Sequence, residues 1–390
     1  MNAYDITFYD LLSRALGENT SSALQSFLNE TMAVKYNALQ LDGFEFDPFM
    51  QDDFTFEQIV AELGINAAAQ YYDLDSPAIP DKVSGAKAYT GKIPRMKKVE
   101  YFNEDKLRKM LIVENRRDVS ADRIAEIAYE QLFVTVDRLV GGHTNALTFQ
   151  RHQAVSSGKF IINGTNNPNG IAGVTVDYHV PAANKTTLSG TARWWTSSTH
   201  TQANEGSNSD PVADLMGEVN KARIAGVRGH FEVELDYFKE VLGHSKVVAA
   251  IGVAALPAAD ASTQASYAGV MGYERKKEVL ETIIGAPIKT IDSLVAIQKV
   301  DATTKSIVTS NTRAFNQNVF VFVPDGNIGV VKTVRPIAVD GGVYGQFYDG
   351  RLLLTVGADY VKKCQSYNTE MTSLVIPTAV SYFWYLFPNA

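Results

Sequence analysis

The sequence predicts an α+β fold organised around one long helix. Between residues 120 and 158, apolar side chains recur at steps of three and four, which is the spacing of one face of an α-helix. Residues 227–330 carry both strand and helix patterns and predict an α/β layer, whereas residues 331–390 consist mainly of strand patterns. Together these three observations predict a mixed α+β chain.

The first 64 residues are predicted to form an arm that lies on another surface. Residues 1–41 contain two short amphipathic helix patterns, followed by a turn at residues 43–48. Residues 56–63 fit a short helix that ends at Gly64. Helices this short are marginal in isolation, so the arm needs something to lie against.

The stretch after the arm is extended and basic. A turn cluster at residues 75–81 precedes residues 82–100, for which we expect a hairpin with bends at Gly85 and Gly91. Six cations form a basic strip along this hairpin: Lys82, Lys87, Lys92, Arg95, Lys97 and Lys98.

The long helix is the strongest pattern of the chain. Ser120 suits its N-cap, and Gly158 suits its end. Unbroken, it would be roughly 58 Å long at 1.5 Å per residue. The Gly141-Gly142 pair lowers helix propensity, so periodicity alone leaves two interpretations open: one beam that carries other elements, or an ordinary segment of two helices. The predicted apolar stripe contains Ile124, Ala128, Leu132, Val136, Leu139, His143 and Leu147.

A strand and a polar loop follow the helix. Residues 174–180 alternate as a strand does, and residues 182–208 are rich in Ser and Thr around Trp194-Trp195. Two exposed tryptophans would suit a carbohydrate platform or an anchor at a protein interface, and we favour the interface. Asp210 and Pro211 then open a helix as its cap and first residue.

The remainder of the chain supplies strands and helices for the layer and the final sheet. Strands are predicted at residues 231–233, 318–324, 352–356 and 374–376, and helices at residues 236–242 and 276–284.

Composition excludes several classes of function. The formal charge of −7 argues against a surface that binds nucleic acid as the chain's main role. Cys364 is the only cysteine, so neither an internal disulfide nor a cysteine-rich zinc site can form, and its own role stays open. No apolar run reaches the ~20 residues that a membrane span needs, and the absence of a signal-peptide pattern predicts a cytoplasmic protein.

Motifs for catalysis or cofactor binding do not emerge. Residues 85–93 superficially resemble a phosphate-binding loop, but Ile93 stands where a hydroxyl is required. The six histidines include no pair at the i, i+4 spacing of a helical metal site. We therefore expect no enzyme activity, cofactor or metal.

The order of these parts, together with three short phrases, resembles a known family. The phrases are Ala154-Val-Ser-Ser-Gly-Lys159, Val176-Asp177-Tyr178 and Asp210-Pro-Val-Ala-Asp214. Together they resemble the major capsid proteins of tailed bacteriophages, of the lambda-type capsid protein E family with the Hong-Kong-97-like fold. The resemblance covers most of residues 80–390.

This resemblance implies a role for each region. It implies an N-terminal arm at residues 1–64, an E-loop at 65–105, a P-domain with the spine helix at 106–208, an A-domain at 209–335, and a return to the P-domain at 336–390. The protein would then form hexamers and pentamers of an icosahedral head in the virion, assembled in the host cytoplasm around double-stranded DNA.

The family also implies partners and limits. The implied partners are copies of the chain, portal and scaffolding proteins, and a decoration protein. The basic strip and the tryptophan pair would lie at subunit interfaces, so charge reversal of Lys97 and Lys98 would impair assembly more than folding. No Lys–Asn crosslinking pair or cleaved pro-segment is evident. The rival interpretations are an encapsulin-like compartment shell and an α/β enzyme.

Overall fold

The structure is a computed structural model of the 390-residue chain. It describes residues 41–61, 86–102, 108, 121–301, 303–304, 306–337, 343–359 and 364–389. The predicted helices of residues 1–40, together with Lys82, Gly85 and Ser120, lie outside these ranges. The chain divides into two compact units: unit 1 is Met1–Phe56, Lys92–Thr148 and Val330–Val375, and unit 2 is Glu57–Gly91, Phe149–Gly329 and Ile376–Ala390.

Unit 1 is built on a sheet of strands in the order β1-β13-β16-β15-β14, with β4 also paired to β16. Strand β16 is the longest, and its antiparallel register with β4 sets Glu370 opposite Lys97. The strands are β1 Phe44–Phe46, β4 Arg95–Phe102, β13 Gly329–Thr333, β14 Val343–Phe347, β15 Leu352–Asp359 and β16 Cys364–Pro377.

Unit 2 is built on a sheet in the order β7-β17-β12-β8-β9 with helices around it. Strand β12 is central, and Phe320, Val321 and Phe322 are all buried because both faces of a central strand are covered. The strands are β7 Lys185–Thr187, β8 Gly229–Glu234, β9 Ile288–Ile291, β12 Phe320–Pro324 and β17 Trp384–Phe387. The helices are α6 Pro211–Ile224, α7 Leu235–Val241, α8 Ser245–Ala255, α9 Ala261–Val270 and α10 Tyr273–Ile284.

Smaller elements complete the described chain. Three two-stranded sheets pair β2 Thr55–Ala61 with β3 Ala86–Lys92, β5 Lys159–Ile162 with β6 Val174–Asp177, and β10 Leu294–Val300 with β11 Ile307–Arg313. Single turns of 3₁₀ helix lie at Ala182–Asn184, Gly190–Ala192, Gln202–Asn204 and Val380–Tyr382.

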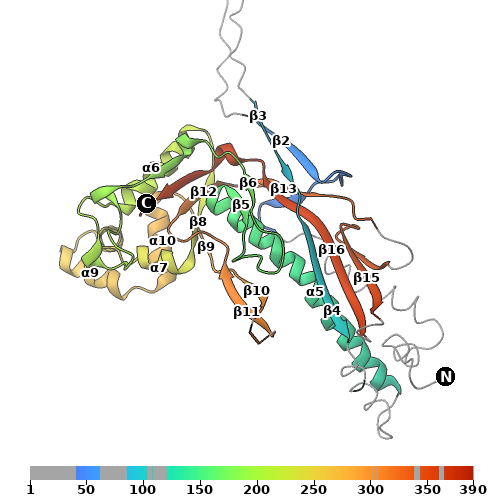
Figure 1. The fold of residues 1–390 in the computed structure, drawn as a ribbon. Coiled ribbons are helices and arrows are strands. Elements are labelled where there is room, and N and C mark those ends of the chain that lie inside the picture. Colours follow the sequence, from blue (N-terminus) through green and yellow to red (C-terminus); the bar gives the residue numbers. More distant parts are fainter. Residues whose placement is uncertain are drawn as a thin grey trace, which may run out of the picture. The chain divides into compact units, whose positions relative to one another are not determined.

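The long helix α5 runs from Ala121 to Ser157, 37 residues without interruption, and appears in green in Figure 1. Of the two interpretations that periodicity left open, the structure supports the single helix, and the glycine pair does not break it. In unit 1, Val136, Leu139, His143 and Leu147 of the predicted stripe are each 2% exposed or less. These buried side chains provide the packing energy that offsets the weak helix propensity of two glycines.

Gly142 has a packing role as well. A Cβ atom at this position would lie 2.6 Å from both Cδ and Nζ of Lys98, whereas a Cβ at Gly141 would meet nothing within 4 Å. The Lys98 ammonium donates a hydrogen bond of 2.7 Å to the carbonyl of Arg138 on the same helix. The missing side chain at Gly142 therefore lets a lysine from β4 cross the helix surface.

Most predicted helices and strands are confirmed, and helix α6 shows why. Asp210 caps it by accepting a hydrogen bond of 3.1 Å from the Ala213 amide, and Pro211 occupies the first turn. Helix α10 ends at Gly285, whose φ of 75° is the left-handed conformation that glycine adopts without strain. Local chemistry of this kind is visible in a sequence.

Two predictions about residues 56–100 are wrong in detail. The expected helix at residues 56–63 is instead strand β2; its Thr, Phe, Ile and Val residues are strand formers, and pairing with β3 decides the conformation. The extended conformation of residues 86–102 is confirmed, but β3 and β4 do not form a hairpin together, because β3 pairs with β2 and β4 with β16.

The glycine pair offers a matched test of the Lys98 crossing. Gly141→Ala should raise the free energy of unfolding by up to about 1 kcal/mol through helix propensity. Gly142→Ala should raise the free energy of unfolding only slightly, because the new methyl group displaces Lys98 from the Arg138 carbonyl. Urea unfolding followed by circular dichroism measures both variants. In a Lys98→Ala background, Gly142→Ala should raise the free energy of unfolding as much as Gly141→Ala does. If both glycine replacements had equal effects in the native background, Lys98 would not depend on the missing side chain at Gly142.

Candidate functional site

The basic strip is distributed over two strands rather than one hairpin. Lys92 is exposed at the end of β3, and Arg95, Lys97 and Lys98 lie on β4. Lys82 lies outside the described residues, and of Lys87 the structure describes only the backbone, in β3. The strip that can be assessed thus consists of one cation on β3 and three on β4.

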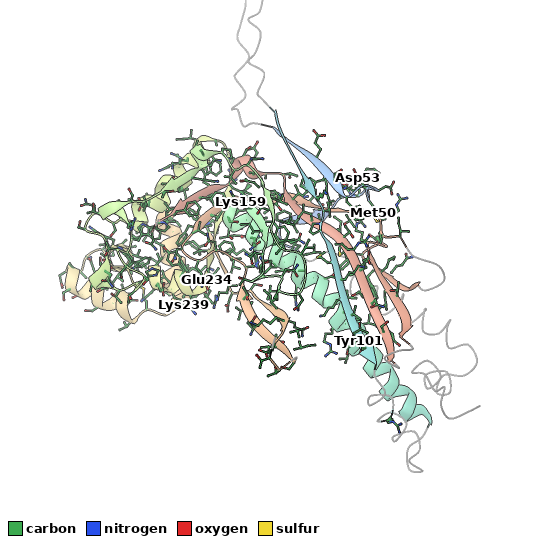
Figure 2. All side chains as sticks on the ribbon, viewed as in Figure 1. Met50, Asp53, Tyr101, Lys159, Glu234 and Lys239 are labelled. Atoms are coloured by element: carbon green, nitrogen blue, oxygen red, sulfur yellow. The ribbon has the colours of Figure 1, made fainter. Side chains whose placement is uncertain are left out.

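Strand β4 alternates between two faces. Arg95 and Lys97 share the exposed face with Val99 and Tyr101, which are 41% and 45% exposed; Tyr101 is labelled in Figure 2. Basic and large apolar side chains therefore stand side by side on a solvent-facing strand. Arginine and aromatic residues are enriched at protein interfaces, whereas lysine is depleted from their cores, so this face suits the rim of a contact.

Two cations of this face are partly neutralised within the chain. The Arg95 Nε atom lies 3.0 Å from one oxygen of Glu370, and the Lys97 Nζ atom lies 3.2 Å from the other. The Arg95 guanidinium also covers the ring of Phe54 at 5.5 Å. Since all of these groups are exposed in part, each ion pair contributes little to stability, about 0–1 kcal/mol.

Lys98 belongs to the opposite face of β4 and serves the fold of unit 1. Burial, followed by the charge of Arg138, lowers its pKa. Because Lys98 is held on helix α5 and Lys97 on β16, charge reversal of both residues would also perturb the fold. Lys92 is therefore the cleaner position for a test of subunit contact.

Trp194 and Trp195 lie in the core of unit 2, with 0% and 2% of their surfaces exposed. The Trp194 indole N–H donates to the Asp214 carboxylate at 2.8 Å, and its ring meets that of Phe320 edge-on at 5.4 Å. Burial raises the pKa of Asp214. Side chains without exposed surface cannot anchor a partner, so the structure corrects the prediction of an interface role for both tryptophans.

A buried ion pair in unit 2 escaped the sequence analysis. Arg151 of helix α5 and Glu232 of β8 are 2% and 0% exposed and form two parallel hydrogen bonds, one of them 2.7 Å from Nη1 to Oε2. Burial alone would raise the pKa of Glu232, but the charge of Arg151, its hydrogen bonds and the nearby His230 lower it to about 2. Arg151 follows Leu147 at a step of four and so continues the apolar stripe of the helix. A charged residue in such a stripe needs a buried partner of opposite charge, and this was the signal that the sequence contained.

Two histidines of helix α5 are buried and uncharged at neutral pH. Burial is the main cause that lowers the pKa of His143 and of His152 to about 4. The His143 ring lies 3.0 Å from the Thr369 hydroxyl in unit 1. Among the described residues, no group of three or more His, Cys, Asp or Glu side chains is arranged to hold a metal ion, and no helix is long and apolar enough to cross a membrane.

The exposed face of β4 thus combines basic and apolar side chains, whereas the tryptophan pair and the Arg151–Glu232 pair belong to the interior of unit 2. The family model described as phage major capsid protein E matches residues 20–341. The chain belongs to this family. It is a capsid shell protein whose place is the virion capsid, and its copies associate with one another. The resemblance found in the sequence is confirmed, and the encapsulin-like alternative is not favoured.

Solved structures with a similar fold have low sequence identity. A putative capsid protein of a prophage of Escherichia coli CFT073 has 11% identity and a TM-score of 0.48, over 95% of this chain and 99% of that one. The capsid of cyanophage P-SCSP1u has 9% sequence identity and a TM-score of 0.46, over 91% of this chain and 89% of that one. A phage-related protein from Bordetella bronchiseptica has 12% sequence identity and a TM-score of 0.44, over 96% of this chain and 95% of that one. A comparison with curated proteins finds no match.

The core position of Trp194 predicts a loss of stability when it is truncated. Trp194→Ala should lower the free energy of unfolding by about 3–5 kcal/mol, measured by urea unfolding with circular dichroism. Ile224→Ala, at a residue 70% exposed on helix α6, is the control and should change it by less than about 0.5 kcal/mol. Unchanged stability of Trp194→Ala together with lost assembly would restore an interface role.

The buried pair predicts a defined pH dependence. Because the pKa of Glu232 falls from 4.5 to about 2 on folding, its ionised form stabilises the protein above about pH 4.5, and this contribution is lost as pH falls toward 2. Glu232→Gln should cost about 3–5 kcal/mol at pH 7, because it removes the carboxylate that faces the buried Arg151 guanidinium. It should also reduce the loss of stability between pH 4.5 and 2, measured by urea unfolding. The same pH slope in wild type and variant would contradict this assignment.

Proposed function

We propose that copies of this chain join as hexamers and pentamers into an icosahedral head that encloses double-stranded DNA. The observation that carries the proposal is the sheet of β2 and β3, in which these two strands pair with no further strand among the described residues. A two-stranded ribbon buries too little surface to be stable by itself in water. A neighbouring copy that covers it would supply the missing layer.

The regions implied by the family fit this proposal. Residues 1–64 would form the arm, 65–105 the E-loop, 106–208 the P-domain with the spine helix, 209–335 the A-domain, and 336–390 the return to the P-domain. The exposed face of β4 and Lys92 would lie against neighbouring copies, with Lys82 and Lys87 in the same strip. Portal, scaffolding and decoration proteins are proposed partners that act on the assembled shell.

The net negative charge of the chain is compatible with a shell that encloses DNA without binding it tightly. The chain carries a formal charge of −7, and an acidic wall repels packaged phosphate groups instead of binding them in a sequence-specific manner. The cations of the strip would serve contacts between copies, where complementary charge guides orientation and encounter. The match to the capsid protein family supports a structural subunit over the α/β enzyme alternative.

Assembly of the purified protein is the direct test. Negative-stain electron microscopy and sedimentation should show closed shells, or rings of five and six copies. Ring closure follows from heterologous contacts repeated around an axis. A chain that stays monomeric or dimeric, even with its scaffolding protein present, would overturn the proposal.

The basic strip has a test of its own. Lys92→Glu should lower the yield of particles by about tenfold or more, which corresponds to about 1.4 kcal/mol of lost association free energy, while the urea unfolding midpoint stays near that of wild type. Lys246→Glu, the same charge change on an exposed residue of helix α8, is the control. Equal particle yields from both variants would remove the strip from the interface.

A further inference from the structure

The ribbon of β10 and β11 presents an apolar surface that is exposed in the described part of the chain. Its two strands pair antiparallel from Leu294 opposite Arg313 to Val300 opposite Ile307, and both are drawn in orange in Figure 1. Leu294, Val300 and Ile307 are 52%, 52% and 68% exposed. All three lie on one face, because Val300 and Ile307 are partners and Leu294 lies six residues before Val300.

This ribbon is held firmly at its base. The Arg313 guanidinium forms ion pairs with three carboxylates, those of Glu234, Asp236 and Asp292. Glu234 ends strand β8, and Figure 2 labels it. Val295, on the other face of the ribbon, is only 8% exposed. The base of the ribbon is thus tied to unit 2 by both charge and apolar contact.

A second attachment lies further along β10. The Asn169 side chain donates to the Gln298 carbonyl at 2.9 Å and accepts from the Val300 amide at 3.3 Å. These are the backbone groups that an added strand would need, so Asn169 blocks the edge of β10 against strand addition there. Contact with a partner must therefore use a face of the ribbon or the edge of β11. Of the four exposed large apolar side chains of the ribbon, Leu294, Val300 and Ile307 share one face, and Val308 lies on the other.

Exposure of this kind is costly unless a partner covers it. A two-stranded ribbon has no second layer of its own, and exposed apolar patches rimmed by polar residues mark interaction sites. Gln298, Thr309 and Asn311 share the face with the apolar side chains and supply the polar rim. The ribbon is fixed by Arg313 at its base and by Asn169 along the edge of β10, so its apolar face keeps a defined direction relative to the rest of unit 2.

A second copy of this chain is the partner that the family match indicates. The family to which the chain belongs forms shells from many copies, so a second copy is the partner present at every ribbon. Apart from Arg313 at the base, the patch face of β10 and β11 carries no charged side chain, because Lys299 pairs with Val308 on the opposite face. A second copy, which has the same net charge of −7, can therefore meet this face without like-charge repulsion at the contact.

We propose that the face of the β10–β11 ribbon formed by Leu294, Val300 and Ile307 binds a second copy of this chain. The inference rests on the self-association that underlies the proposed function, and it assigns one contact of the shell to a named surface. The contact is heterologous or isologous according to which part of the second copy receives the ribbon.

A charged residue in the patch tests the proposal. Ile307→Asp should lower particle yield by about tenfold or more, since a buried interface carboxylate without a partner is unfavourable. Ser310→Asp, on the same strand but the opposite face, is the matched control and should assemble as wild type does. Yield is measured by sedimentation and electron microscopy, and folding by circular dichroism.

The outcomes separate this inference from the proposed function. If wild type and Ile307→Asp both form shells in equal yield, the ribbon is not an interface, although the proposed function stands. If wild type forms no shells under any condition, the proposed function itself fails. Equal losses in Ile307→Asp and Ser310→Asp would also overturn the inference, because the effect would not depend on the face.

Crosslinking identifies the occupant without depending on a destabilising charge. Ile307 is replaced by the photoreactive residue benzoylphenylalanine, and assembled particles are irradiated. A product with twice the mass of the chain, whose peptides all come from this chain, supports the proposal. Crosslinks only to a scaffolding, decoration or host protein, or only within one chain, would overturn it.

Discussion

Both compact units of this protein draw part of their core from one helix, and this is the constraint on which the rest of the structure depends. In unit 1, helix α5 contributes Val136, Leu139 and Leu147 to the core, and in unit 2 it contributes the guanidinium of Arg151. The helix must therefore continue through Gly141-Gly142, where propensity alone would allow a break. Packing on either side of the glycines maintains it.

Much of the fold could be predicted because its local determinants are strong. The period of helix α5, the Asp210-Pro211 start of α6 and the buried run that became β12 each decide an element within a few residues. Strand β2 could not be predicted, because seven residues with Phe, Ile and Val fit a short helix as well as a strand until the pairing with β3 is known. Pairing between distant segments is absent from a local pattern.

The candidate site was less predictable, since burial decides what a side chain does. Trp194-Trp195 in a polar segment gave no indication that both rings turn into the core, and Lys97 and Lys98 are neighbours with different surroundings because a strand alternates its faces. Glu232 and Arg151 are 81 residues apart, so only their burial reveals them as a pair. The family resemblance, by contrast, rested on the order of parts and was sound.

The placement of tryptophan has a practical consequence for spectroscopy. The chain has 3 tryptophans, and Trp194, Trp195 and Trp384 are all buried residues of unit 2. The shift of intrinsic tryptophan emission to longer wavelength on unfolding will therefore report the opening of unit 2 and will be blind to unit 1. Two optical probes that disagree along a denaturation curve would then measure the independence of the two units, rather than a fault in the sample.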